Sequence, residues 1–234
     1  MESARRVVAA QRARGYHTRA LTATRSEPAE AHSILPLAVL EAIRSLDSPS
    51  DEEVAEYVDE LLKKRFGLSD TVAAQIGRYG AAARRDGPVT EEELVQILRL
   101  VSRRTDAALV FADGGRRAAR RALGRLGGTT LWMTRHLPRP LRHFVGFRVA
   151  RGAAREVLGA HLAREGADVV ATVGHGVTIR ATPDGASCAF FASALAELLK
   201  NLVDFEGTLH HNRCRSRGDD RCEWRTSSNP ERRP

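Results

Sequence analysis

Apolar residues recur at steps of three and four along the first two-thirds of the chain, which is the period of an α-helix. The first such segment begins at Ile34. Ser50 with Glu53, and Thr90 with Glu93, have the spacing of capping boxes that open two further helices. The same period and its breaking residues predict helices over residues 69–85, 115–126 and 139–165, although glycines interrupt the last of these. The first two-thirds of the chain is therefore expected to be helical.

After Gly166 the pattern changes to one rich in β-forming residues. Residues 167–183 are expected to form two strands joined by a turn at 174–176. Residues 188–203 are apolar on nearly every side, which predicts a buried helix. The segment that follows predicts a hairpin turning at residues 217–219. The expected fold is α+β, with a helical N-terminal half and then a β-β-α-β-β antiparallel sheet packed on helices.

These patterns divide the chain into four parts. Residues 1–33 carry many arginines and few large apolar groups, which is typical of a disordered or loosely attached basic arm. Residues 34–105 form a helical extension, residues 106–226 the domain that contains the sheet, and residues 227–234 a tail.

Charge and cysteine content narrow the class of protein. The formal net charge is +8, and almost all of the positive charge is arginine. Nucleic-acid binding is not favoured, because basic runs such as residues 116–121 are typical of a solvated helix face. No segment approaches the ~18 continuous apolar residues of a membrane span, and the N-terminus lacks the apolar run of a signal peptide. Three cysteines, an odd number, favour a reducing cytoplasm.

All three cysteines lie in the last quarter of the chain. A three-residue hairpin loop centred on Gly218 would place Cys214 opposite Cys222. Together with Cys188 and one histidine they make a tetrahedral zinc set, which leaves the metal no open position and is therefore structural. The alternatives are a cross-strand disulfide between Cys214 and Cys222, or three small buried thiols that bind nothing.

The histidine of this set is not fixed by local geometry. In a regular strand the side chain of His211 points to the face opposite Cys214, and His210 lies ~13 Å from Cys214. Neither histidine reaches a shared ion unless Asn212 and Arg213 form a bulge. Periodicity alone does not choose between His210 and His211.

The spacing Cys188–(22 residues)–His211–(2)–Cys214–(7)–Cys222, with "GDDRCEW" at the end, resembles the 4-vinyl-reductase-type (hydrocarbon-binding) domain. That family is related in fold to the small subunits of the TRAPP vesicle-tethering complex and to the sensory module of phenol-responsive bacterial regulators. The likeness is specific over residues 167–225, weaker over 108–166 and absent over 1–105. It implies a structural zinc held by these four residues, with His211 where the family has an acidic residue.

The resemblance also implies a homodimer, with an interface from helices before Gly166, and an apolar cavity for a small hydrophobic or aromatic molecule. The residues proposed to line this cavity are Trp132, His143, Phe144, Phe147 and Phe191. The main expectation is a ligand sensor or carrier without turnover, because the chain has no phosphate loop, dinucleotide motif or nucleophile motif. The alternatives are an enzyme or accessory factor for tetrapyrrole (bacteriochlorophyll) 4-vinyl reduction, and a DNA-binding regulator using the helix-turn-helix-like residues 63–85.

Overall fold

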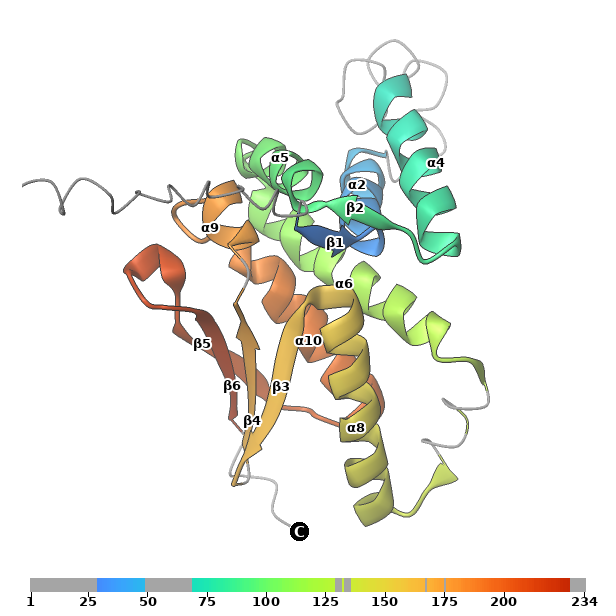
Figure 1. Cartoon of the computed structure of the whole chain (residues 1–234), viewed down its shortest axis with the longest axis vertical. Helices are drawn as coiled ribbons and strands as arrows, with labels where there is room; N and C mark the ends of the chain where they lie inside the picture. The colour runs from blue at the N-terminus through green and yellow to red at the C-terminus, as the bar shows by residue number, and fades with distance from the viewer. Residues whose placement is uncertain are drawn as a thin grey trace, which may run out of the picture.

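The structure is a computed structural model that describes residues 29–48, 69–128, 132, 136–166, 168–174 and 176–227. The elements before the main sheet are β1 (Glu30–His32), α2 (Ile34–Asp47), α4 (Asp70–Arg84), β2 (Pro88–Thr90), α5 (Glu91–Ser102), α6 (Ala107–Arg125) and α8 (Arg139–Leu158). The elements that follow are β3 (Ala160–Glu165), β4 (Asp168–Val173), α9 (Val177–Ala181), α10 (Cys188–Val203), β5 (Thr208–Arg213), the 3-10 turn η3 (Arg215–Arg217) and β6 (Cys222–Ser227). The predicted α+β class, with a helical N-terminal half and a C-terminal hairpin, is confirmed (Figure 1).

The helical half begins with a short strand that the sequence pattern did not predict. β1 pairs antiparallel with β2, so residues 30–32, which the pattern assigned to the basic arm, belong to the fold. The predicted N-cap at Thr90 is confirmed, since its hydroxyl accepts a hydrogen bond from the backbone N–H of Glu93 at 3.3 Å, while the carboxylate of Glu93 pairs with Arg78 at 3.1 Å. The helix expected after Ser50 and most of the arm, residues 1–28, lie outside the described residues.

Helix α10 lies at the centre of the molecule and packs against α6, α8 and β5 (Figure 1). Its buried residues include Phe190, Phe191 and Leu198, as its all-round apolar sequence predicts. The crossing with α6 is close because Gly115 has no side chain. A Cβ built at Gly115 would lie 2.2 Å from the carbonyl oxygen of Phe190. This packing also fixes the position of Cys188, the first residue of α10.

The main sheet is antiparallel, with the strand order β3-β4-β6-β5. Helix α8 ends at Gly159, which adopts a left-handed conformation with φ 61°. Residues 160–165, predicted to continue this helix, instead form β3 and pair with β4. The strand expected after the turn at 174–176 is also wrong, because residues 177–181 form the short helix α9. The β-β-α-β-β order therefore holds with a different first hairpin, β3–β4.

Among the helices formed by the described residues, none is both long enough and apolar enough to cross a membrane.

Candidate metal centre

The terminal hairpin contains a bulge at the position the metal set requires. His211 pairs with Trp224, but the next pair joins Arg213 to Glu223, so Asn212 has no partner across the ladder. A bulge of this kind turns the following side chain to the other face of the strand. As a result His211 and Cys214 lie on the same side of the hairpin, which regular alternation would forbid.

The turn after β5 brings the two hairpin cysteines opposite each other. Cys214 follows the last ladder residue of β5, and Cys222 precedes the partner of that residue in β6. The connection is a 3-10 turn rather than a three-residue loop, and Gly218 closes it with φ 94°. The carbonyl oxygen of Cys214 accepts hydrogen bonds from the N–H groups of Arg217 and Asp219 at 2.9 and 3.2 Å.

One potential ligand atom from each of Cys188, His211, Cys214 and Cys222 lies within 4.8 Å of the others. The Sγ of Cys188 is 3.9 Å from that of Cys214 and 3.8 Å from that of Cys222. Four ligands placed tetrahedrally at the usual zinc–sulfur distance of ~2.3 Å would be about 3.8 Å apart. The sulfur of Cys188 therefore already has the spacing of a zinc tetrahedron from each of the other two sulfur atoms. All three are free thiols, so the cross-strand disulfide is not formed.

The cluster is buried, and the hydrogen bond between two of its sulfur atoms gives them unequal proton affinities. Cys188, Cys214 and Cys222 are 4%, 3% and 1% exposed. The hydrogen bond between Cys188 and Cys222 lowers the pKa of the Cys222 thiol and raises that of the Cys188 thiol, and burial raises the latter further. The neighbouring His211 ring and the hydroxyl of Thr178 also lower the pKa of the Cys222 thiol. Such an environment suits a cation that several sulfur atoms share.

His211, and not His210, is the histidine of the cluster. Its ring stacks on the buried Trp224, with centroids 4.8 Å apart and planes 8° from parallel. Its buried Nε2 has no hydrogen-bond partner among the described residues, which is the arrangement of a nitrogen kept for a metal. His210 is exposed and its Nε2 instead bonds the hydroxyls of Thr208 and Ser227 at 3.0 and 2.8 Å.

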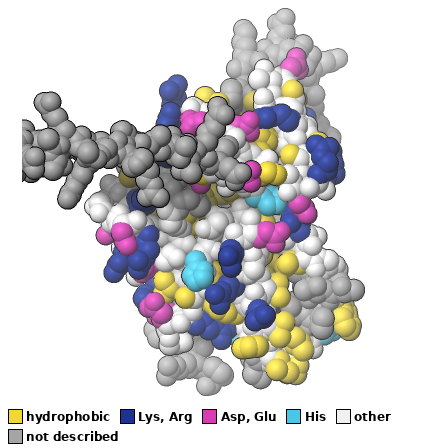
Figure 2. All heavy atoms as spheres, in the orientation of Figure 1, with side chains coloured by type: hydrophobic (Ala, Val, Ile, Leu, Met, Phe, Trp, Pro, Cys, Tyr) yellow, Lys and Arg dark blue, Asp and Glu magenta, His cyan; other side chains and the backbone are white. Residues whose placement is uncertain are grey.

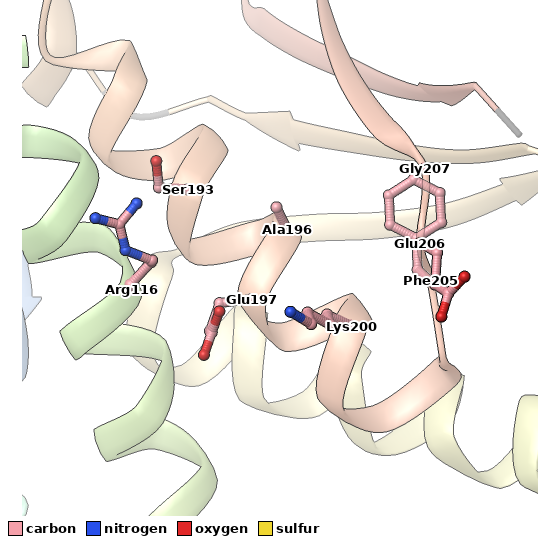
Figure 3. Close-up of a pocket in the computed structure, with 8 residues that line it drawn as sticks. All are labelled: Arg116, Ser193, Ala196, Glu197, Lys200, Phe205, Glu206 and Gly207. Carbon is pink, nitrogen blue, oxygen red and sulfur yellow. The ribbon is translucent and has the colours of Figure 1, made fainter. Parts of the chain in front are cut away.

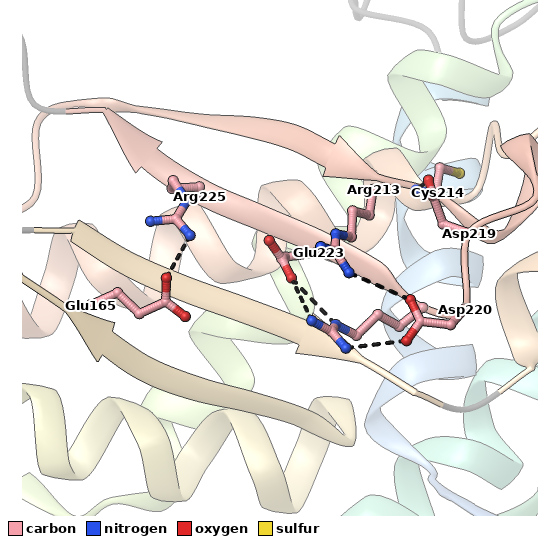
Figure 4. Close-up of polar contacts among 8 residues, drawn as sticks. Glu165, Arg213, Cys214, Asp219, Asp220, Glu223 and Arg225 are labelled. Atoms are coloured by element: carbon pink, nitrogen blue, oxygen red, sulfur yellow. Dashed lines mark hydrogen bonds and ion pairs between the residues drawn. The ribbon is translucent and has the colours of Figure 1, made fainter.

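Polar groups that the sequence reasoning missed surround the sulfur atoms. The hydroxyl of Ser216 is 2.8 Å from the Sγ of Cys214, and that of Thr178 is 3.7 Å from the Sγ of Cys222. The backbone N–H of Cys214 donates to the carboxylate of Asp219 at 2.6 Å (Figure 4). Gly185, with φ 80°, leaves room for the sulfur, because a Cβ there would lie 3.2 Å from the Sγ of Cys214. The turn residues of "PDG" and "GDD" were the only sequence signals of this role.

The outer face of the hairpin is held by ion pairs rather than by apolar contacts (Figure 4). Asp220 contacts Arg213 at 3.8 Å and Arg221 at 3.2 Å, and Arg221 also reaches Glu223 at 3.1 Å. Pairs as exposed as these contribute little free energy each. The hairpin is joined to the rest of the sheet by the ladder between β6 and β4, and the internal cluster joins it to the first residue of α10.

The five residues expected to line an apolar cavity are scattered. The side chains of Trp132 and Phe144 are 63% and 67% exposed, and His143 is exposed as well. The ring of Phe147 lies under the guanidinium of Arg164, at 4.5 Å, and Phe191 is fully buried in the core.

Three cavities are described at the surface, and none is lined by any of those five residues. One cavity, of about 470 Å³, lies between α6, α10 and the segment after α10 (Figure 3). Its lining residues are Arg116, Ser193, Ala196, Glu197, Lys200, Phe205, Glu206 and Gly207. We call it the α6–α10 groove.

The helix-turn-helix-like segment is only partly described. The residues before 69 that were expected to form its first helix lie outside the described residues, whereas α4 packs on α2 and buries Val72 and Tyr79. Comparison with known proteins found no matching family model, no matching curated protein and no matching solved structure.

Proposed function

We propose that the chain is a zinc-stapled binding domain in which the metal fastens the terminal hairpin to α10. The observation that carries this proposal is the convergence of Cys188 with His211, Cys214 and Cys222, whose ligand atoms lie within 4.8 Å of one another. Thiolates and imidazole suit zinc better than hard cations. Four protein ligands fill its coordination shell, so the metal would stabilise the fold and would activate neither water nor substrate.

We further propose that the domain binds a small aromatic or hydrophobic molecule without turnover, and that the α6–α10 groove is where it binds. The groove volume of about 470 Å³ falls within the ~300–1,000 Å³ of small-molecule sites. The half-buried ring of Phe205 forms one wall. Gly207 allows the chain to pass this ring, because a Cβ there would lie 2.7 Å from it.

The charges around the groove refine the class of ligand. Lys200 has no ion-pair partner among the described residues, and Glu197 is paired with Arg120 at 3.0 Å. The guanidinium of Arg116 is 3.6 Å from Asp113, whose shorter contact, at 2.5 Å, is to Arg117. Arg116 and Lys200, with weak or no pairing beside an aromatic wall, favour an aromatic molecule with a phenolic or acidic group, although Glu206 is also part of the lining.

Thermal shift measurements with simple phenols, benzoates and arenes test this proposal. We expect a ligand to raise the melting temperature by mass action. Part of this increase should remain at ~0.5 M salt, because salt does not screen the apolar contacts of the ligand. Phe205→Ala should remove the shift. Phe144→Ala, which truncates an equally aromatic residue outside the groove, should leave the shift unchanged. Stabilisation only by polyanions or DNA, lost with salt, would instead indicate nucleic-acid binding.

A further inference from the structure

Helix α8 presents a stripe of exposed residues that no other described element covers. Leu141, Phe144, Arg148, Arg151 and Arg155 follow one another at steps of three and four, so they lie on one helix face. All five are exposed, and the side chains of Leu141 and Phe144 are 53% and 67% accessible. The opposite face of the helix packs on α10 and β3. We call these five residues the α8 stripe.

The α8 stripe has an apolar end and a basic end. Figure 2 shows hydrophobic side chains gathered at the end of the molecule where α8 begins, with Lys and Arg side chains farther along. Arg148, Arg151 and Arg155 have no ion-pair partner among the residues that the structure describes, whereas Arg142 on the same helix is paired with Asp204 at 2.5 Å. Exposed large apolar groups next to unpaired arginines are unusual on a surface that meets only water.

We propose that the α8 stripe docks the protein on an anionic lipid surface, with Leu141 and Phe144 entering the headgroup region and the three arginines contacting lipid phosphates. Charge complementarity selects this partner. An interfacial helix combines apolar and aromatic residues with arginines, and each basic residue near an anionic membrane adds to the binding. A nucleic acid would contact the arginines but would leave both apolar side chains in water. A second copy of the chain, with its own α8 parallel to this one, would place its stripe arginines against these arginines.

The approach of the stripe to the lipid does not require the chain to refold. Helix α8 is held on its inner face by Gly146, where a Cβ would lie 1.9 Å from the carbonyl oxygen of Leu202. The helix is therefore fixed to the core, and its outer face meets a partner as a rigid surface. Trp132, before the start of α8, is a further exposed aromatic residue at 63% accessibility. Aromatic residues of this kind are enriched at membrane interfaces.

Sedimentation of the full-length chain with vesicles tests the proposal. We expect binding to phosphatidylcholine vesicles that contain about one-third phosphatidylglycerol, and much weaker binding to pure phosphatidylcholine. R148Q/R151Q/R155Q should weaken binding by about a hundredfold, near fivefold per arginine. The matched control R84Q/R85Q/R103Q removes three exposed arginines at the C-terminal ends of α4 and α5 and should weaken vesicle binding far less. Equal loss in the two triple variants would mean that only net charge matters, and would overturn the proposal.

The apolar half of the stripe needs its own variant. Leu141→Ala with Phe144→Ala should weaken binding by about tenfold per residue, including at ~0.5 M salt, where the arginine contribution is screened. Leu109→Ala, which is 63% exposed on α6, is the control and should bind as the unmodified chain does. No binding to anionic vesicles would overturn the proposal, as would binding of DNA or RNA alone. The proposal would also be overturned if the α8 variants changed only the oligomeric state and left vesicle binding as it was. Melting temperatures equal to that of the unmodified chain show that the variants are folded.

Discussion

Replacing Cys188 by serine should separate the terminal hairpin from the central helix. Cys188 is the only cluster member on α10, whereas His211, Cys214 and Cys222 all belong to the hairpin region. Cys188 and Cys222 are 34 positions apart in the sequence. A cross-link that closes a loop of that length stabilises a fold by about 4 kcal/mol in the chain-entropy description. At about 2–4 °C per kcal/mol for a protein of this size, the melting temperature should fall by about 8–16 °C.

The assay is thermal unfolding of the unmodified protein and of Cys188→Ser, each with and without a metal chelator. The chelator should lower the melting temperature of the unmodified protein and add little to the effect of Cys188→Ser, because the staple is already broken. Arg215→Ala is the control. It keeps the backbone of the same turn and removes only an exposed hydrogen bond to the carbonyl of Gly174, so it should change stability by no more than about 0.5 kcal/mol. Equal melting temperatures for Cys188→Ser and Arg215→Ala would refute the staple.

Three further predictions concern the helices. Gly115→Ala should destabilise the protein by about 1–3 kcal/mol, because its Cβ would overlap the α10 backbone, whereas Gly124→Ala in the same helix has open space and should stabilise it by up to about 1 kcal/mol. Urea unfolding measures both changes, and a change in the free energy of unfolding of the same sign for both variants would contradict the packing. Arg104→Leu should cost about 3 kcal/mol at neutral pH, because it leaves the buried Asp47 without this bidentate partner. The hydrogen bond from Arg104 also holds the pKa of Asp106 below its usual value, so the stability that this pair contributes is complete above pH ~4 and is lost as the pH falls through the folded-state pKa of Asp106. A difference in stability between the unmodified protein and Arg104→Leu that grows in acid would contradict this pairing. The chain should also be a homodimer through helices before Gly166, which a monomer mass in light scattering at tens of micromolar would rule out.

Sequence pattern predicted best where a helix or turn depends on its own residues. The buried helix at Cys188, the cap at Thr90 and the closing turn at Gly218 are all visible in the sequence, because apolar periodicity, a side-chain cap and a left-handed glycine are local properties. The four residues of the Cys/His cluster were also predicted from the sequence, although the choice of His211 came from a resemblance and not from geometry.

The pattern failed where tertiary contacts override local preference. Residues 160–165, "AHLARE", favour a helix by composition, but they pair along their whole length with β4, and Ala160 and Leu162 are buried on either side of the exposed His161. Val177 and Ile179 suggest a strand, yet α9 is stabilised by hydrogen bonds around Thr178 and by ion pairs from Arg180 to Glu91 and Glu92 on α5. The residues expected around a ligand depended on the family resemblance alone, and the structure scatters them between core and surface.

The metal content of the purified chain tests the central claim most directly. Native mass spectrometry of protein prepared without chelators should show one zinc bound per chain, and none, or a small fraction, after Cys214→Ser. Acidification should release the metal, because protons compete for the same thiolates and imidazole. A well-folded chain that carries less than about half an equivalent of any metal, and whose melting temperature a chelator leaves unchanged, would contradict the account.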